Sequence, residues 1–242
     1  MKYLTPVDRL NEDRCQNILE TSEDISDVIE LLSDLEYKSI LKQAVGNLDE
    51  TRALFAIETA LNKMVYEQIQ KAINKLKGRD KKIAQTVLGM EIDSINIKII
   101  LRCKSIGINN DQIMKYLLTS KTFNKNELDT ALEATDIKSF IGFLLSVLRN
   151  RFSIDYTPLL KELLREYEAS KSLSQLEIIL DRNLLETNLR MVKKYTPYFN
   201  ISLILAFLNA KWFEIRNLRA IIIGAKNNRP REMIMKLLIF SN

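Results

Sequence analysis

The sequence contains no histidine. Histidine is the commonest general base and metal ligand, and its ordinary pKa lies near neutrality. Without it, a Ser–His or Cys–His nucleophile pair is impossible, and a zinc ion would have to be held by carboxylates and two cysteines distant in sequence, Cys15 and Cys103. So few cysteines do not form a disulfide framework and are typical of a reducing compartment. We therefore expect a cytoplasmic protein.

Phosphate-binding loops are also missing. The glycines stand alone, and no G-x-x-x-x-G-K-[ST] run occurs. Paired carboxylates such as Asp49–Glu50 lie in polar segments and indicate solvated surface. The sequence thus predicts no catalytic residue, no bound cofactor and no metal site.

Glycine and proline are scarce, with 6 and 4 residues in a chain of 242. This supply of turn residues is too small for a many-stranded β protein. Three of the prolines follow a threonine, at Thr5–Pro6, Thr157–Pro158 and Thr196–Pro197. Threonine caps a helix N-terminus and proline suits the first helical turn, so we expect helices to begin at these sites and at Pro230. The predicted fold class is all-α.

No apolar run is long. The most apolar window, Ile201–Leu208, is far shorter than the roughly 20 residues that span a bilayer, and the first residues do not resemble a signal peptide. With 36 Lys and Arg against 31 Asp and Glu, the net charge of +5 permits an anionic partner without requiring one. We expect any membrane association to be peripheral.

Apolar residues along the sequence recur with the spacing of an α-helix. Apolar residues between Leu54 and Leu76 form one stripe, and those between Leu173 and Leu184 start another. We expect six or seven helices in each half of the chain, with polar loops such as Gly78–Lys82 and Ser120–Lys125 between them. Cys103 and Trp212 are expected in the core.

An internal repeat organises the chain. Asp93–Lys98 aligns with Glu214–Arg219 at a shift of 121 residues, and Ile113–Lys115 aligns with Ile234–Lys236 at the same shift. Upstream the shift becomes 119 and pairs Glu58, Leu61 and Asn62 with Glu177, Leu180 and Asp181. Three blocks in the same order favour duplication over chance. The sequence predicts two helical lobes, residues 1–121 and 122–242.

Six residues mark the repeated motif: Asp93, Asn96, Lys98, Glu214, Asn217 and Arg219. Asp93 and Asn96 share one helix face, and Glu214 and Asn217 repeat that face. We interpret the two asparagines as structural clasps that tie their helix to a neighbouring turn or backbone; contact with a partner protein is the alternative. Lys98 and Arg219 lie on another side, where solvent exposure is expected. Asp111 and Glu232 are predicted in the first turn of the next helix, where the dipole favours negative charge.

The segments Gly89–Lys104 and Glu214–Ile221 resemble the repeated signature of the C subunit of the archaeal A-type ATP synthase, which is similar to the d subunit of the eukaryotic vacuolar (V-type) ATPase. The resemblance implies an all-helical protein with lobes arranged about a pseudo-symmetry axis in a funnel. Members of the family have three lobes, whereas two are visible here, which implies an open crescent.

The resemblance also implies a function. A non-catalytic central-stalk subunit would couple the rotor shaft subunits to the membrane proteolipid ring during proton-driven ATP synthesis, at the cytoplasmic face of the membrane, without nucleic acid or a small-molecule substrate. The alternative is a helical-repeat scaffold that binds a protein or nucleic acid in its groove. Basic clusters such as Lys77–Lys82 lack the interleaved aromatics that single-stranded nucleic acid would require.

Overall fold

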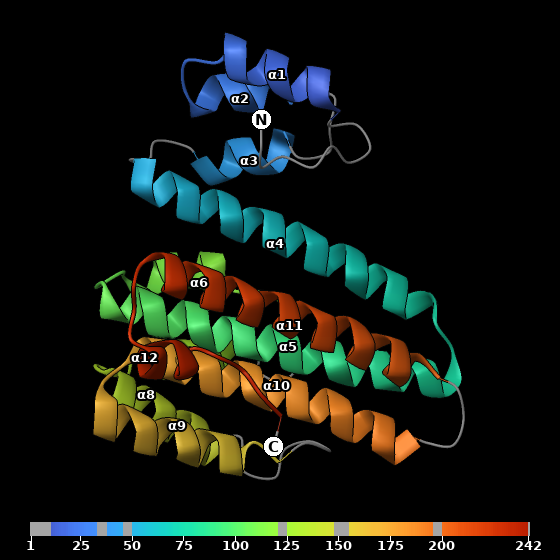
Figure 1. Ribbon diagram of the computed structural model, residues 1–242, viewed down its shortest axis with the longest axis vertical. Helices are drawn as coiled ribbons and strands as arrows, with labels where there is room; N and C mark the ends of the chain where they lie inside the picture. Colours follow the sequence, from blue (N-terminus) through green and yellow to red (C-terminus); the bar gives the residue numbers. More distant parts are fainter. Residues whose placement is uncertain are drawn as a thin grey trace. The chain divides into compact units, whose positions relative to one another are not determined.

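The computed structural model describes residues 11–32, 38–45, 50–120, 125–147, 155–195 and 200–241. Every regular element within these ranges is an α-helix (Figure 1), which confirms the predicted all-α class. The chain divides into two compact units, Met1–Gln68 and Ile69–Asn242. This division follows compactness and not sequence similarity, so the lobes at 1–121 and 122–242 stay a prediction.

The first unit contains three short helices and the beginning of a long one. They are α1 (Glu12–Thr21), α2 (Ile25–Leu31), α3 (Lys38–Val45) and α4 (Glu50–Lys75), which continues into the second unit. The side chains of Asn11 and Asp24 cap α1 and α2 by accepting backbone N–H bonds of 2.9 Å from residues three positions later. Helix α2 packs against both α1 and α3, with Ile18, Ile29 and Leu41 buried.

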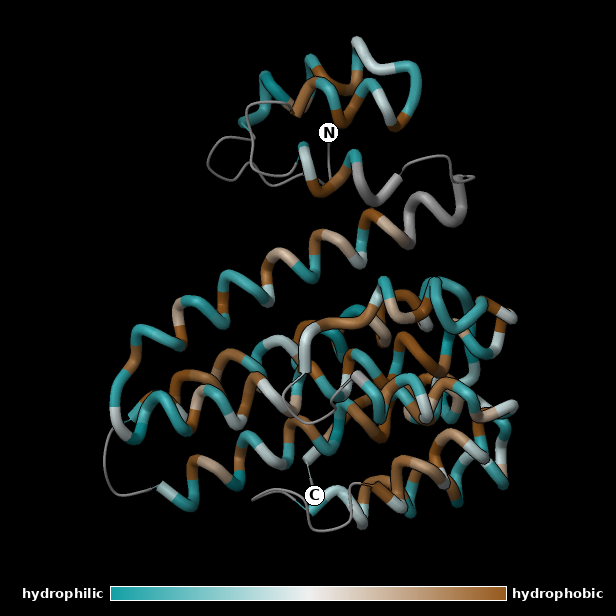
Figure 2. Tube along the Cα trace, turned by 180° about the vertical axis from the view of Figure 1, so that it is seen from behind, coloured by the Kyte–Doolittle hydropathy of each residue, from teal (hydrophilic) through white to brown (hydrophobic). Residues whose placement is uncertain are grey.

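Three long helices form the centre of the second unit. Helices α5 (Gly78–Ser105), α10 (Leu173–Tyr195) and α11 (Ile201–Lys226) contact one another in every pairing and run side by side in Figure 1. Helix α5 is buried on several faces, as Ala84, Ile92 and Ile97, which point in different directions around the helix, are at most 4% exposed. Hydrophobic residues recur along each of the helices, as Figure 2 shows.

Shorter helices complete this unit: α6 (Asn110–Tyr116), α7 (Lys125–Leu132), α8 (Ile137–Val147), α9 (Thr157–Ser170) and α12 (Arg231–Met235). Helix α9 packs on α8 and α10. It begins at the predicted Thr157–Pro158 step, and Pro230 directly precedes α12, as predicted. The threonine–proline steps at Pro6 and Pro197 lie outside the described residues.

Two predictions about the loops and the core were wrong. The segment Gly78–Lys82 is the first turn of α5 and not a loop, because the chain reverses within two residues and Gly78 takes a left-handed conformation with φ of 57°. Trp212 lies on the surface of α11, 65% exposed, and not in the core. Of the predicted Ser120–Lys125 loop, residues 121–124 lie outside the described part of the chain, and Lys125 begins α7.

Candidate functional site

Asn96 lies fully buried on α5 and holds the backbone that follows α6. Its Nδ2 donates to the carbonyl oxygen of Leu118 at 2.9 Å, and its Oδ1 accepts from the Leu118 N–H at 2.8 Å. Both polar atoms of the amide are thereby used on one residue's backbone, at the point where the chain leaves α6 and helical hydrogen bonds end. The predicted tie between amide and backbone is present.

Asn217 makes the same contact on α11. Its Nδ2 donates to the carbonyl oxygen of Ile239 at 2.7 Å, and its Oδ1 accepts from the Ile239 N–H at 2.9 Å. In each case the partner lies 22 residues downstream, after the short helix α6 or α12. Asp111 and Glu232 occupy the first turns of those helices, as predicted. The two segments thus share a local structure as well as a sequence pattern.

The two acidic residues of the motif have different surroundings. Asp93 is fully buried and accepts hydrogen bonds from the Ser120 hydroxyl at 2.6 Å and the Tyr156 hydroxyl at 2.7 Å. Glu214 is exposed and pairs with Lys211, three residues earlier, at 2.6 Å. The equivalent placement that the repeat suggests therefore holds for the asparagines and not for the two carboxylates. The difference arises because Tyr156, which directly precedes α9, covers only the first of the two positions.

Lys98 is not solvent-exposed, contrary to the prediction. Its Nζ contacts the Asp181 carboxylate of α10, which is 6% exposed and also receives the guanidinium of Arg216 from α11. One carboxylate thus joins three helices. Burial, followed by the nearby Arg216 charge, lowers the pKa of Lys98 to about 8. Its counterpart Arg219 is exposed, as predicted.

A second ion pair joins α5 and α10, one helical turn away from the Lys98–Asp181 contact. The Arg102 guanidinium on α5 contacts Glu177 of α10 twice, Nε to Oε1 at 2.6 Å and the second terminal nitrogen to Oε2 at 2.8 Å. Such paired geometry is the strongest form of an arginine–carboxylate contact. Sequence analysis missed Asp181 and Tyr156 as anchoring residues. The signal for Asp181 was a carboxylate directly after the apolar run Ile178–Leu180.

Cys103 is fully buried in α5, as expected of a core residue, and burial raises the pKa of its thiol to about 11. The neighbouring Lys104 donates to the carbonyl oxygens of Leu132 and Ala134, both at 2.7 Å, and so caps the C-terminal end of α7. Both residues serve the packing of α5 and not chemistry.

Two small cavities among the described residues are lined mainly by apolar side chains. A cavity of about 10 Å³ is lined in part by Ser94, Tyr156 and Asn183, and one of about 20 Å³ lies between α4 and α5 beside Ile73 and Gly89. Each has room for about one water molecule. Across the described ranges, no group of three or more cysteine or acidic side chains could hold a metal ion. None of the helices described is both long and apolar enough to cross a membrane.

Helix α11 carries an apolar surface, which we call the α11 face. Ten large hydrophobic side chains on this helix are between 42% and 65% exposed: Leu203, Ile204, Phe207, Leu208, Trp212, Ile215, Leu218, Ile221, Ile222 and Ile223. Exposed apolar side chains in such number on one helix are typical of an interaction surface. The second unit is therefore a helical body that exposes apolar side chains along α11.

Comparison with known proteins decides the family. The profile of the ATP synthase (C/AC39) subunit family matches residues 1–237. The chain belongs to the ATP synthase (C/AC39) subunit family. This confirms the family resemblance of the repeated segments.

Named relatives agree with this family. The chain is 30% identical to the C subunit of the A-type ATP synthase of Methanocaldococcus jannaschii over 235 residues, which are 97% of this chain and 55% of the relative. It is 29% identical to that of Methanothermobacter thermautotrophicus over 91% of the chain and 56% of the relative. It is 28% identical to that of Methanosphaera stadtmanae over 98% of the chain and 60% of the relative. The chain thus spans little more than half the length of these relatives. No solved structure matches it significantly.

Proposed function

We propose that this chain is a non-catalytic central-stalk subunit of an archaeal-type rotary ATP synthase, which couples the rotor shaft subunits to the membrane proteolipid ring during proton-driven ATP synthesis. The observation that carries the proposal is the family match over residues 1–237. Relatives named as the C subunit of A-type ATP synthases support it. The proposed location is the cytoplasmic face of the membrane, where the subunit binds peripherally.

The interior of the second unit suits a part that transmits torque. Such a part needs helices that do not slide past one another under load. Polar contacts at fixed positions supply this resistance, because Asp181 joins α5, α10 and α11, and Asn96 fixes the segment after α6 to α5. These contacts join parts of the chain to one another, and the proposal assigns no catalytic residue.

Affinity purification tests the proposal. The chain is tagged at native expression level in its own cells, membranes are extracted in a mild detergent, and co-purifying proteins are identified by mass spectrometry. We expect catalytic head subunits, a coiled-coil shaft subunit and small proteolipids. An identically tagged unrelated cytoplasmic protein is the control for carry-over of membrane complexes.

Recovery of none of these subunits would contradict the proposal. Recovery of nucleic acid or of an unrelated protein complex would instead favour a helical-repeat scaffold. ATP hydrolysis by the purified chain alone would contradict the non-catalytic assignment.

A further inference from the structure

Three segments of the second unit meet at one end of its long helices. They are the turn between α4 and α5, the C-terminal end of α10 and the first turn of α11 (Figure 1). The Ile201 N–H at the start of α11 donates to the Asp80 carboxylate in the first turn of α5 at 3.2 Å. Tyr195, the last residue of α10, and Ile201 pack against buried Ile83 and Met191. These contacts lie within the second unit and hold the three segments beside one another.

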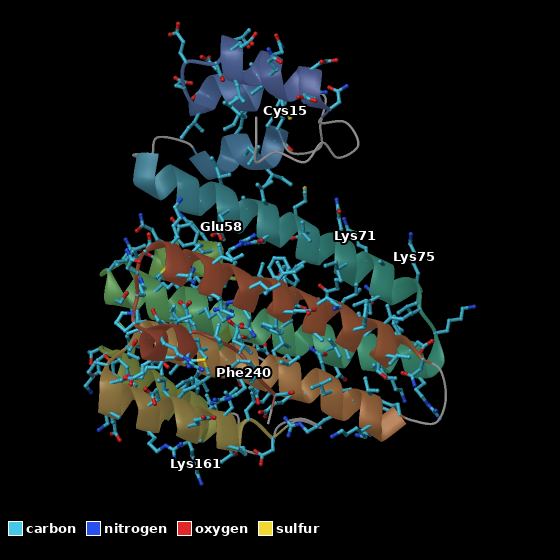
Figure 3. The ribbon with its side chains drawn as sticks, in the orientation of Figure 1. Cys15, Glu58, Lys71, Lys75, Lys161 and Phe240 are labelled. Atoms are coloured by element: carbon cyan, nitrogen blue, oxygen red, sulfur yellow. The ribbon has the colours of Figure 1, made fainter. Side chains whose placement is uncertain are left out.

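Positive charge is concentrated at this end of the second unit, which we call the basic end. Residues 69–85 and 187–205 contain nine of the 36 Lys and Arg residues but only one of the 31 Asp and Glu residues, Asp80. The nine are Lys71, Lys75, Lys77, Arg79, Lys81, Lys82, Arg190, Lys193 and Lys194, and all except the half-buried Lys81 are exposed. Figure 3 shows Lys71 and Lys75 extending outward from α4. The rest of the chain has more acidic than basic residues, so an anionic partner is expected at the basic end.

The kind of residue at the basic end favours a lipid surface over nucleic acid. Seven of the nine cations are lysines, whose ammonium groups act as hydrated point charges, whereas arginine is the usual contact to a defined phosphate or base. Single-stranded nucleic acid also requires aromatic rings on which its bases stack. Among the described residues of these segments, the one aromatic side chain is Tyr195, which packs against Ile83 and Met191.

Apolar side chains lie beside these charges. Leu203 and Ile204 belong to the first turn of α11 and are not covered by the rest of the second unit, since they are 48% and 46% exposed. An anionic bilayer accommodates both features, because its headgroups attract lysines and its interfacial zone takes up aliphatic side chains. The phosphates of nucleic acid would use the charges alone.

We propose that the basic end binds directly to a bilayer surface that carries anionic phospholipids. The lysines of α4, α5 and α10 contact the headgroups, and Leu203 and Ile204 enter the headgroup zone. Each lysine close to an anionic bilayer strengthens binding about fivefold, so several together give stable attachment. The contact is with lipid itself and requires no other ATP synthase subunit. It therefore goes beyond the proposed function, in which the proteolipid ring is the membrane partner.

Sedimentation with lipid vesicles tests the proposal. The purified chain is mixed with vesicles of phosphatidylcholine alone or of an equimolar mixture of phosphatidylcholine and phosphatidylglycerol, and the bound fraction is measured against lipid concentration. We expect binding to the anionic vesicles to be at least about tenfold tighter than to the neutral ones. Added salt should weaken it, because exposed charges are screened.

Variants locate the contact on the molecule. Lys77→Gln combined with Lys82→Gln should weaken binding to anionic vesicles about tenfold. The matched control is Lys115→Gln with Lys161→Gln, which removes the same charge from exposed positions on α6 and α9 and should leave binding nearly unchanged (Figure 3). Leu203→Gln should weaken binding about fivefold, because it removes the apolar contribution. Circular dichroism should show that all variants keep the helical fold.

Three results would overturn the proposal: no binding to vesicles, equal binding to neutral and anionic vesicles, or a loss in the control variant as large as that in the Lys77 and Lys82 variant. Tighter binding to double-stranded DNA than to anionic vesicles would also overturn it and assign the basic end to nucleic acid. These measurements use the isolated chain and defined lipids, whereas the proposed function is tested by purification from cells. Failure of one is therefore distinguishable from failure of the other.

Discussion

Asn96 and Asn217 make the same pair of hydrogen bonds, each to the backbone of a residue 22 positions later. The Asn96 clasp is buried, while Asn217 is half-buried. Loss of either amide side chain leaves a backbone N–H and a carbonyl oxygen without their partner. The resulting loss in the free energy of unfolding depends on whether water can take the place of the amide. The same contact should therefore contribute differently at the two sites.

We expect Asn96→Ala to lower the free energy of unfolding by about 3 kcal/mol and Asn217→Ala by about 1 kcal/mol. Urea denaturation followed by circular dichroism measures both. Asn74→Ala, at an exposed position of α4, serves as control and should leave stability nearly unchanged. Equal losses at Asn96 and Asn217 would show that burial does not set the strength of the clasp.

Asp181→Asn should destabilise the fold strongly. The substitution leaves Lys98 and Arg216 facing each other without the carboxylate between them, and removal of one partner of a largely buried ion pair costs about 3 kcal/mol. Thermal and urea unfolding both report the loss. For comparison, Glu168→Gln breaks the exposed Lys138–Glu168 pair. It should leave the midpoint of unfolding unchanged within experimental error. Wild-type stability of Asp181→Asn would show that the three helices are held by apolar packing alone.

Gly224→Ala should displace α12 from α11. A methyl group at this position would lie 2.6 Å from Cγ1 of Ile234, well inside contact distance. We expect a loss of about 2 kcal/mol in the free energy of unfolding from this overpacking. Ile234→Ala in the same chain should recover part of the loss, because it removes the clashing atoms.

Gly142→Ala is the matched control for Gly224→Ala. It also replaces a glycine within a helix, α8, but no neighbouring atom lies within 4 Å of the added methyl group. It should stabilise the protein by about 0.5 kcal/mol or more through helix propensity. Urea denaturation measures all of these variants. Additive effects of Gly224→Ala and Ile234→Ala would contradict the clash.

Cys103 should make stability fall at alkaline pH. Burial raises the pKa of its thiol from 9.0 to about 11, so the folded state holds its proton more tightly than the unfolded state. The resulting stabilisation is complete below pH 9 and is lost as the pH rises towards 11. We expect the free energy of unfolding of wild type to decrease more steeply over this window than that of Cys103→Ala. Parallel pH profiles would show that the thiol does not contribute.

The sequence predicted the helical class and the asparagine clasps because each depends on local pattern. An amide at a repeated position within an apolar stretch requires a hydrogen-bonding partner, and a backbone supplies one wherever the helix lies. The sequence did not predict that Trp212 is exposed or that Lys98 pairs with Asp181. Helical spacing shows which residues share a face, but which neighbour covers that face depends on contacts far apart in the chain, such as Lys98 with Asp181, 83 residues away.

Helix α5 receives side-chain contacts along much of its length from segments far apart in the sequence. Asn96 binds the chain after α6, Asp93 binds Tyr156 at the start of α9, and Lys98 binds Asp181 of α10. No part of α5 near these contacts can open without releasing several other segments together. Its backbone amides should therefore exchange their hydrogens only when the second unit unfolds as a whole, which makes α5 the slowest-exchanging part of that unit.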